Sequence, residues 1–117
     1  MFVKKLLIGT LFAAAMLPSL ASAAYPDRAI SIVVPYAPGG TADALARVIA
    51  LNLGKKLNQS IVVENKSGAS GMIGEAYVAR AKGDGYTLLY DATPLSINPF
   101  LHKLSFNPET DLMPLTL

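Results

Sequence analysis

Three short runs of β-branched and aromatic residues alternate with two longer stretches of helical spacing, and this alternation limits the fold more than any other feature. The runs cover residues 29–35, 60–65 and 86–90. The stretches between them, residues 42–57 and 72–81, repeat apolar residues three or four positions apart, which predicts amphipathic helices. Parallel strands are joined by right-handed helical crossovers. We therefore expect an α/β fold in which a parallel βαβαβ sheet is flanked by helices.

The helical spacing also predicts where the first helix begins and which side chains face the core. Thr41 is the expected N-cap of that helix. A short helical turn is expected near residues 98–101. The side chains expected on the buried faces are Leu45, Val48, Ile49, Leu53 and Leu57 in the first helix and Ile73, Tyr77 and Val78 in the second.

The first residues have the pattern of an export signal. Lys4 and Lys5 precede an uncharged apolar run over residues 6–17, and Ala-Ser-Ala follows at residues 21–23. This pattern predicts a signal peptide over residues 1–23 with cleavage between Ala23 and Ala24. The apolar run is too short to span a bilayer, so we prefer a cleaved signal to the alternative of an uncleaved anchor.

Charge and cysteine content narrow the function and the compartment. Lys4 and Lys5 account for the net charge of +2, so the mature chain is neutral and has no basic cluster suited to nucleic acid. The sequence contains no cysteine, which excludes disulfides, thiol metal sites and a lipid anchor on cysteine. We expect a periplasmic protein. Because the chain ends in the apolar residues 114–117, we also expect a truncated one.

Small, polar and glycine-rich loops follow all three predicted strands, at residues 38–41, 67–71 and 92–96. Ligands of open parallel sheets bind at the carboxyl ends of the strands. Two of the loops lead directly into helices, whose free N–H groups favour anions. The loops contain no lysine or arginine, although Lys66 flanks the second. They predict a carboxylate site without a fixed cation, unless the glycines only permit tight turns.

Asp43 has two possible roles, because it falls in the first turn of the first predicted helix. A carboxylate is favoured there by the helix dipole whatever the function. It could instead contact an ammonium or hydroxyl group of a solute. Arg47, further along the helix, is expected to matter mainly through packing or a surface ion pair.

Enzymatic functions find little support in the sequence. Glu64 ends the second strand where a dinucleotide fold places an acid, but the first loop lacks G-x-G-x-x-G, so Glu64 is better explained as a solvated strand end. His102 is expected on the surface, and no base can be assigned to Ser67, Ser70 or Ser96. No spaced histidines or cysteines suggest a metal site. We expect no catalytic residue, no metal and no cofactor.

Several distinctive motifs occur along the chain, namely YPDR at residues 25–28, VVPYAPGGTAD at 33–43, VVENKSGASG at 62–71, DGYTLL at 84–89, INP at 97–99 and LSFNP at 104–108. Together they give the chain a resemblance to the Bug family, the solute-binding proteins of tripartite tricarboxylate transporters. It implies a type II periplasmic-binding-protein fold, of which residues 24–117 form the first part of the first lobe. The chain departs from the family pattern at Ser67, Ser70 and Asp91, and Asp91 suggests a solute that also carries a positive group.

The resemblance implies capture of a small carboxylate, such as a di- or tricarboxylate, an acidic amino acid or an aromatic acid, for the membrane subunits of such a transporter. An exported sensory or interaction domain of the same fold remains an alternative, and a nucleotide-binding enzyme domain is a weaker one. The implied ligand-binding residues are Tyr36, Pro38, Gly39, Gly40, Thr41, Asp43, Ala69, Ser70, Gly71, Thr93 and Ser96.

Overall fold

A three-stranded parallel sheet lies at the centre of residues 24–116, the part of the chain that the computed structural model describes. Its strands are β1 (Ile30–Val34), β2 (Ile61–Asn65) and β3 (Thr87–Leu89), in the order β2-β1-β3. The expected parallel sheet is therefore confirmed. Residues 1–23 lie outside the described part, so the signal peptide and its cleavage between Ala23 and Ala24 stay a prediction.

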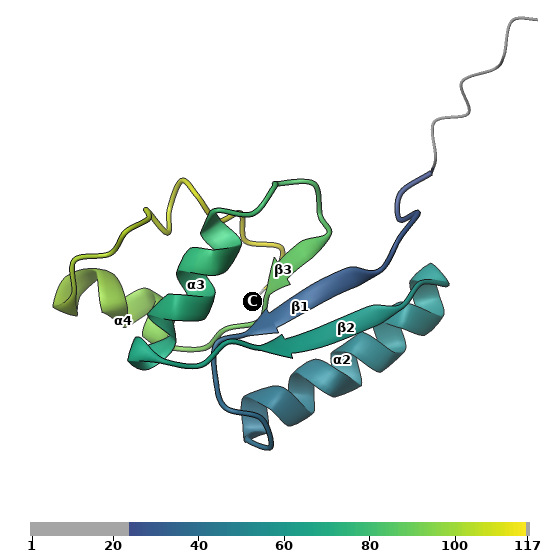
Figure 1. Ribbon diagram of the computed structural model, residues 1–117, viewed down its shortest axis with the longest axis horizontal. Coiled ribbons are helices and arrows are strands. Elements are labelled where there is room, and N and C mark those ends of the chain that lie inside the picture. Colours follow the sequence, from purple (N-terminus) through teal and green to yellow (C-terminus); the bar gives the residue numbers. More distant parts are fainter. Residues whose placement is uncertain (1–23, 117) are drawn as a thin grey trace, which may run out of the picture.

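Helices cover both faces of this sheet. Figure 1 shows α2 (Thr41–Leu57) on one face, and α3 (Met72–Ala79) and α4 (Pro94–Leu101) on the other. A 3-10 turn, η2 (Ala69–Gly71), leads into α3. Helix α4 is longer than the expected turn at residues 98–101, because Pro94 is well suited to the first turn of a helix. None of the helices within residues 24–116 is long and apolar enough to cross a membrane.

The strand order creates a switch point between β1 and β3. These strands are neighbours in the sheet, yet the chain after β1 enters α2 on one face and the chain after β3 enters α4 on the other (Figure 1). In open parallel sheets, the crevice outside the carboxyl ends of two such strands is where ligands bind. We therefore expect a ligand site at the loops that follow β1 and β3.

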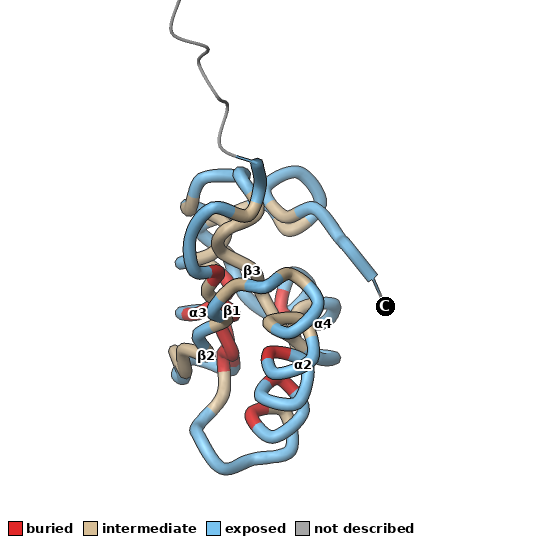
Figure 2. The backbone as a smooth tube through the Cα atoms, turned by 90° about the vertical axis from the view of Figure 1, so that its right-hand side faces the viewer, coloured by how far each residue is buried: buried red, intermediate tan, exposed pale blue. Residues whose placement is uncertain are grey.

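The core is built around the central strand, which Figure 2 shows among the buried segments. Ile32 and Val34 pack with Ala46 and Ala50 of α2. Val33, on the opposite side of the strand, is also fully buried. Burying one such aliphatic side chain contributes about 1.5–3 kcal/mol, so β1 anchors both helical layers.

The expected buried face of α2 is wrong. Leu45, Val48 and Ile49 are 50%, 56% and 42% exposed, and Leu53 and Leu57 are only partly buried. The face toward the sheet carries the alanines of the core instead. Small side chains allow a helix to approach a sheet closely, so the bulkier residues are displaced to its outer surface.

The same correction applies to α3 and to the helix cap. Ile73 and Tyr77 are 55% and 47% exposed, and Val78 is partly buried. The helix instead turns Gly74 toward the sheet. The approach is close, since a Cβ at this position would lie 2.8 Å from the Cβ of Pro35. Thr41 is the first residue of α2 rather than its N-cap, and no side chain caps that helix.

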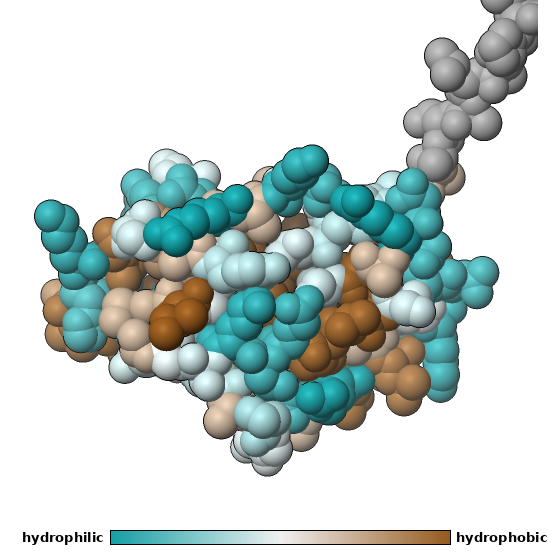
Figure 3. Space-filling model, in the orientation of Figure 1, coloured by the Kyte–Doolittle hydropathy of each residue, from teal (hydrophilic) through white to brown (hydrophobic). Residues whose placement is uncertain are grey.

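Exposed apolar residues give the surface a mixed character. In Figure 3, hydrophobic residues gather where α4 lies and again where the sheet meets α2. On α4, Phe100 and Leu101 are 87% and 67% exposed.

Candidate functional site

Four hydrogen bonds draw the loops after the three strands together. The N–H groups of Lys66 and Tyr90 donate to the carbonyl oxygens of Val34 and Val33, each at 2.9 Å, which aligns the strand ends. The side-chain amides of two asparagines complete the set. Asn65 donates to the carbonyl of Tyr36 and Asn98 donates to the carbonyl of Ser70, each at 3.1 Å. The structure thus brings the expected loops to one edge of the sheet.

The loop after β1 presents backbone donors at the start of α2. Pro38, Gly39, Gly40 and Thr41 are all exposed. Gly39 has a φ of 85°, a value that favours glycine, and its N–H donates to Asp43 Oδ2 at 3.0 Å. Because no side chain caps α2, the N–H groups of its first turn remain available to an anion.

Asp43 is buried beneath this loop and is held by three donors. It is 4% exposed. Its Oδ2 accepts from Arg47 Nε at 3.0 Å as well as from Gly39, and its Oδ1 accepts from Asn65 Nδ2 at 3.0 Å. The hydrogen bond from Arg47 is the main reason why the pKa of Asp43 falls from 3.8 to about 2, with smaller contributions from Gly39 and Asn65. This geometry favours the structural role of Asp43, in which it stabilises the loop at the start of α2, over a contact with a solute.

The two cations beside the loops are already paired. The side chain of Arg47 is 54% exposed and bound to Asp43, in agreement with the expected surface ion pair. Lys66 Nζ lies 3.3 Å from Glu64 and 4.2 Å from the ring centroid of Tyr77. Glu64 is therefore not the simple solvated strand end that we expected, because it also accepts a hydrogen bond from Ser31 Oγ at 2.6 Å.

The loop after β2 has an unusual backbone. Gly68, Ala69, Ser70 and Gly71 have φ values of 131°, 47°, 54° and 95°. Positive φ is uncommon for alanine and serine, and such strain concentrates at functional sites. Ala69 and Ser70 are exposed, whereas Gly71 is buried. The N–H of Gly71 donates to the carbonyl of Gly68 at 3.0 Å, so the exposed donors of this loop must come from its other residues.

The loop after β3 faces the loop after β1. Thr93 and Ser96 are exposed, and no side chain caps the start of α4. Tyr36 Oη donates a short hydrogen bond to Asp91 Oδ1, which links the two loops across the switch point. Burial and the neighbouring carboxylate of Asp91 raise the pKa of Tyr36 above its usual value, so this phenol keeps its proton.

A buried polar cluster behind these loops was missed by the sequence reasoning. Glu75 is fully buried, and Asn98, which is 3% exposed, donates to its Oε1 at 3.2 Å and its Oε2 at 3.5 Å. Burial, followed by the charge of Asp91, raises the pKa of Glu75 from 4.5 to about 7. The signal for this cluster was a lone acid within the apolar sequence of α3, MIGEAYVA.

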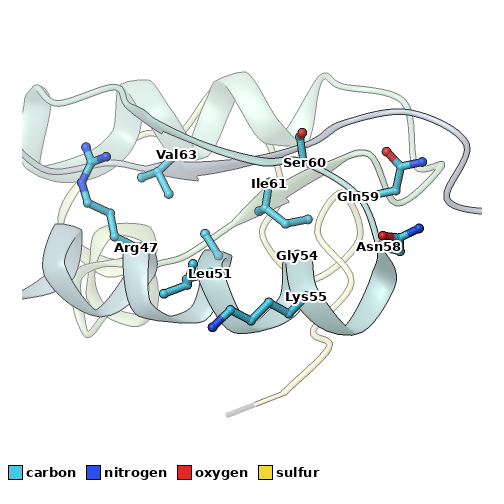
Figure 4. Close-up of a pocket in the computed structure, with 10 residues that line it drawn as sticks. Arg47, Leu51, Gly54, Lys55, Asn58, Gln59, Ser60, Ile61 and Val63 are labelled. Atoms are coloured by element: carbon cyan, nitrogen blue, oxygen red, sulfur yellow. The ribbon is translucent and has the colours of Figure 1, made fainter.

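Other candidate centres are not assembled in the described structure. His102, Ser67 and Ser96 are exposed, and no three histidine, aspartate or glutamate side chains within residues 24–116 could hold a metal ion together. Figure 4 shows a separate open groove between α2 and β2. Arg47 lies at one end of this groove and Gln59 at the other, and none of the expected ligand residues lines it.

Comparisons with known proteins identify the family. The model of the tripartite tricarboxylate transporter family receptor matches residues 45–117. BugT of Bordetella pertussis is 38% identical over 114 residues, which cover 94% of this chain and 35% of that protein. A protein in the tcbD-tcbE intergenic region of a Pseudomonas species is 38% identical over 95 residues, 80% of this chain and 28% of that protein. The chain thus spans about a third of the length of these relatives.

A solved structure supports the fold. MatC of Rhodopseudomonas palustris, with bound malate, has a TM-score of 0.66 and 35% identity over 78% of this chain and 32% of that chain. Solved neighbours of this kind are solute-binding proteins, in agreement with our expectation of a binding module rather than an enzyme. The Bug resemblance is confirmed: the chain belongs to the tripartite tricarboxylate transporter receptor family, whose members include the Bug proteins.

Proposed function

We propose that this chain forms part of a periplasmic solute-binding protein that captures a small carboxylate at the carboxyl edge of its sheet. The observation that carries the proposal is the meeting of three exposed loops around the uncapped start of α2, where the nearest cations are already paired. Among the solved relatives, one protein of Rhodopseudomonas palustris is seen with adipate, and MatC of the same organism has bound malate. The family match supports delivery of the solute to a transporter of the tripartite tricarboxylate type.

The chemistry of the site suits a carboxylate. The N–H groups in the first turn of α2 supply donors and the positive end of a helix dipole. Hydroxyl groups of Thr41, Ser70, Thr93 and Ser96 are exposed on the same three loops and can donate to further carboxylate oxygens. A hydrogen bond to a charged group contributes about 1.5–3 kcal/mol, so a few such bonds hold an anion without a lysine or arginine.

Amide NMR of the chain during titration with malate, succinate, adipate and citrate tests this assignment, because it detects even weak binding. We expect shifts at Gly40, Ser70 and Thr93. Shifts confined to the groove between α2 and β2 would contradict the site. Binding of none of these anions would contradict the carboxylate assignment.

Gly40→Val tests the close approach of the solute to the backbone. A Cβ at Gly40 would have only the carbonyl of Ala37 within 4 Å, at 3.7 Å, so the variant keeps the fold while covering the N–H groups. We expect affinity to fall at least tenfold. Gly83→Val is the matched control, since a Cβ there meets nothing within 4 Å. If Arg47→Ala abolished binding while Gly40→Val left it intact, the site would depend on a cation after all.

Export is tested separately. The charged start and Ala-Ser-Ala at residues 21–23 support periplasmic location after signal cleavage. Mass spectrometry of a periplasmic extract should find a protein that begins at Ala24. A periplasmic or membrane-bound form that still begins at Met1 would contradict cleavage.

A further inference from the structure

Glu75 and Asp91 form a carboxyl pair in a region without positive charge. Glu75 projects from α3 and is fully buried. Asp91 follows β3, its Oδ2 is buried without a hydrogen-bond partner among the described residues, and its charge acts on Glu75 and raises the pKa of that group. Two ionised carboxylates this close repel each other strongly at low dielectric. The pair therefore needs either a cation or a proton.

The surrounding elements supply no cation. The segments that pack against α3, the helix that carries Glu75, are α4, η2, β1 and β3, and none of them contains a charged residue. The polar groups that they and the adjoining loops direct at the pair are the amide of Asn98, the hydroxyl of Tyr36 and the N–H of Ala92. The nearby cations Arg47 and Lys66 are paired with other carboxylates.

One carboxylate oxygen of Asp91 can accept a hydrogen bond through that proton. Its Oδ1 accepts from Tyr36 Oη and from the N–H of Ala92. Its Oδ2 is buried and accepts no hydrogen bond from a donor of the described residues. A protonated Glu75 would be an O–H donor for this oxygen. Both carboxyl groups then have hydrogen-bond partners, because Asn98 also donates to Glu75.

The pair lies directly beneath the proposed anion site. A Cβ at Gly71 would sit 3.0 Å from Glu75 Oε1, so the carboxyl group touches the strained loop after β2. Asn98 bonds both Glu75 and the carbonyl of Ser70 in the same loop. A second negative charge at this position would oppose a carboxylate solute held above it.

We propose that Glu75 and Asp91 share one proton at neutral pH and that this proton allows the loops above them to hold a carboxylate. The first half rests on the burial of the two carboxyl groups and on the unpartnered oxygen of Asp91, and the second half rests on the proposed function. Burial and the charge of Asp91 raise the pKa of Glu75 to about 7, which agrees with a proton held there.

The linkage has a definite sign. A carboxylate above the pair favours the protonated form, so binding takes up a proton wherever Glu75 is partly ionised, and by reciprocity the proton strengthens binding. Affinity should be constant below the pKa of Glu75 and fall above it. The fall is at most about tenfold for each pH unit, because one proton is involved.

Carbon NMR of the side-chain carboxyl groups tests the shared proton. The chain has three glutamates, so glutamate-labelled protein gives three signals, and Glu75→Gln identifies the one that belongs to Glu75. We expect this signal to titrate near neutral pH. A normal midpoint for Glu75 would overturn the proposal. Asp91→Asn is the second variant: an amide donor there should lower the midpoint of Glu75.

Calorimetric titration with malate at pH 6 and pH 8, in buffers of different ionisation enthalpy, tests the link to binding. We expect weaker binding and proton uptake at pH 8, and we expect both effects to disappear in Glu75→Gln, whose amide can donate to Asp91 at any pH. Glu109→Gln should behave like the unchanged chain. A pH-independent affinity with a confirmed neutral midpoint would overturn the link. Binding of no anion would count against the proposed function, while the NMR midpoint would still decide the shared proton.

Discussion

Two buried carboxyl groups, one on each face of the sheet, have opposite surroundings. On the α2 face, Asp43 is held by Arg47, by the N–H of Gly39 and by Asn65, and its pKa falls to about 2. On the α3 face, Glu75 has a carboxylate neighbour and one amide donor, and its pKa rises to about 7. Each group lies beneath a loop of the candidate site. The first loop therefore rests on a permanent charge, and the second on a group that changes its charge near neutral pH.

The asparagines make the comparison closer. Asn65 bonds Asp43 and the carbonyl of Tyr36, whereas Asn98 bonds Glu75 and the carbonyl of Ser70. Each amide thus joins a buried carboxyl group to a loop. What differs is the ion pair: within residues 24–116, Asp43 is paired with Arg47, whereas Glu75 forms no ion pair. Similar clusters of an asparagine and a carboxyl group thus have different protonation states when one of them also contains a cation.

The largest effect should come from separating α3 from the sheet. In Gly74→Val, the new side chain would meet Pro35 Cβ at 2.8 Å and the carbonyl of Lys66 at 3.0 Å. Overpacking of this kind costs about 1–3 kcal/mol or more. Thermal unfolding should show a marked loss of stability, and the pKa of Glu75 should fall as water reaches it. Gly83→Val is the control, and an equal loss there would contradict the close approach of α3.

The next effect is a pH dependence of stability that has opposite sign for the two groups. Because the folded-state pKa of Glu75 is raised, its contribution is complete below about 4.5 and is lost as pH rises through about 7. The slope is at most about 1.4 kcal/mol per pH unit. The contribution of Asp43 is complete above 3.8 and is lost as pH falls through about 2.

Urea unfolding from pH 5 to pH 8 measures the first of these contributions. Stability should decline on the order of 1 to 3 kcal/mol over this range, and the decline should be absent in Glu75→Gln. A decline that persists in this variant would show that another group is responsible.

A smaller effect is expected when the two asparagines are replaced. Asn65→Ala and Asn98→Ala each remove the three hydrogen bonds of the asparagine side chain, at a cost of roughly 1 to 2 kcal/mol. Both should raise the pKa of the carboxyl group that loses its donor. Carboxyl NMR of each variant measures this, and a change at the carboxyl group of the other face would show that the two clusters are coupled.

The smallest effect should come from the strained loop. Ser70 has a φ of 54°, and glycine adopts such a conformation without a steric penalty, so Ser70→Gly should stabilise the fold by about 0.5–1 kcal/mol. The loop after β1 should show no comparable gain, because its positive φ is already at glycine. Ser67→Gly is the control, since Ser67 has no positive φ and the added chain freedom should destabilise it slightly. An equal response of both variants would contradict strain at Ser70.

The strands and the loops could be predicted from the sequence because their signals are local. The β-branched run that became β1 is bounded by turn residues on the same stretch of chain. The loops at residues 38–41 and 67–71 follow strands directly, so the rule that parallel strands end at one edge was enough to bring them together.

Contacts across the sheet could not be predicted in this way. Periodicity placed Leu45 and Ile49 in the core of α2, but the structure buries Ala46 and Ala50. A helix pattern shows that one face is apolar without showing how closely that face approaches its neighbour. The choice between leucine and alanine was made by the fit of α2 against Ile32 and Val34.

The parallel α/β fold, the three loops and the absence of a lysine or arginine within them could all be read from the amino-acid sequence. The charge beneath those loops depends on contacts between residues that are distant in the chain. Glu75 and Asp91 lie sixteen positions apart in the chain, and Asp43 and Asn65 lie twenty-two positions apart. A pKa depends on burial and on neighbours in space, and those neighbours are set by how α2 and α3 pack against the sheet.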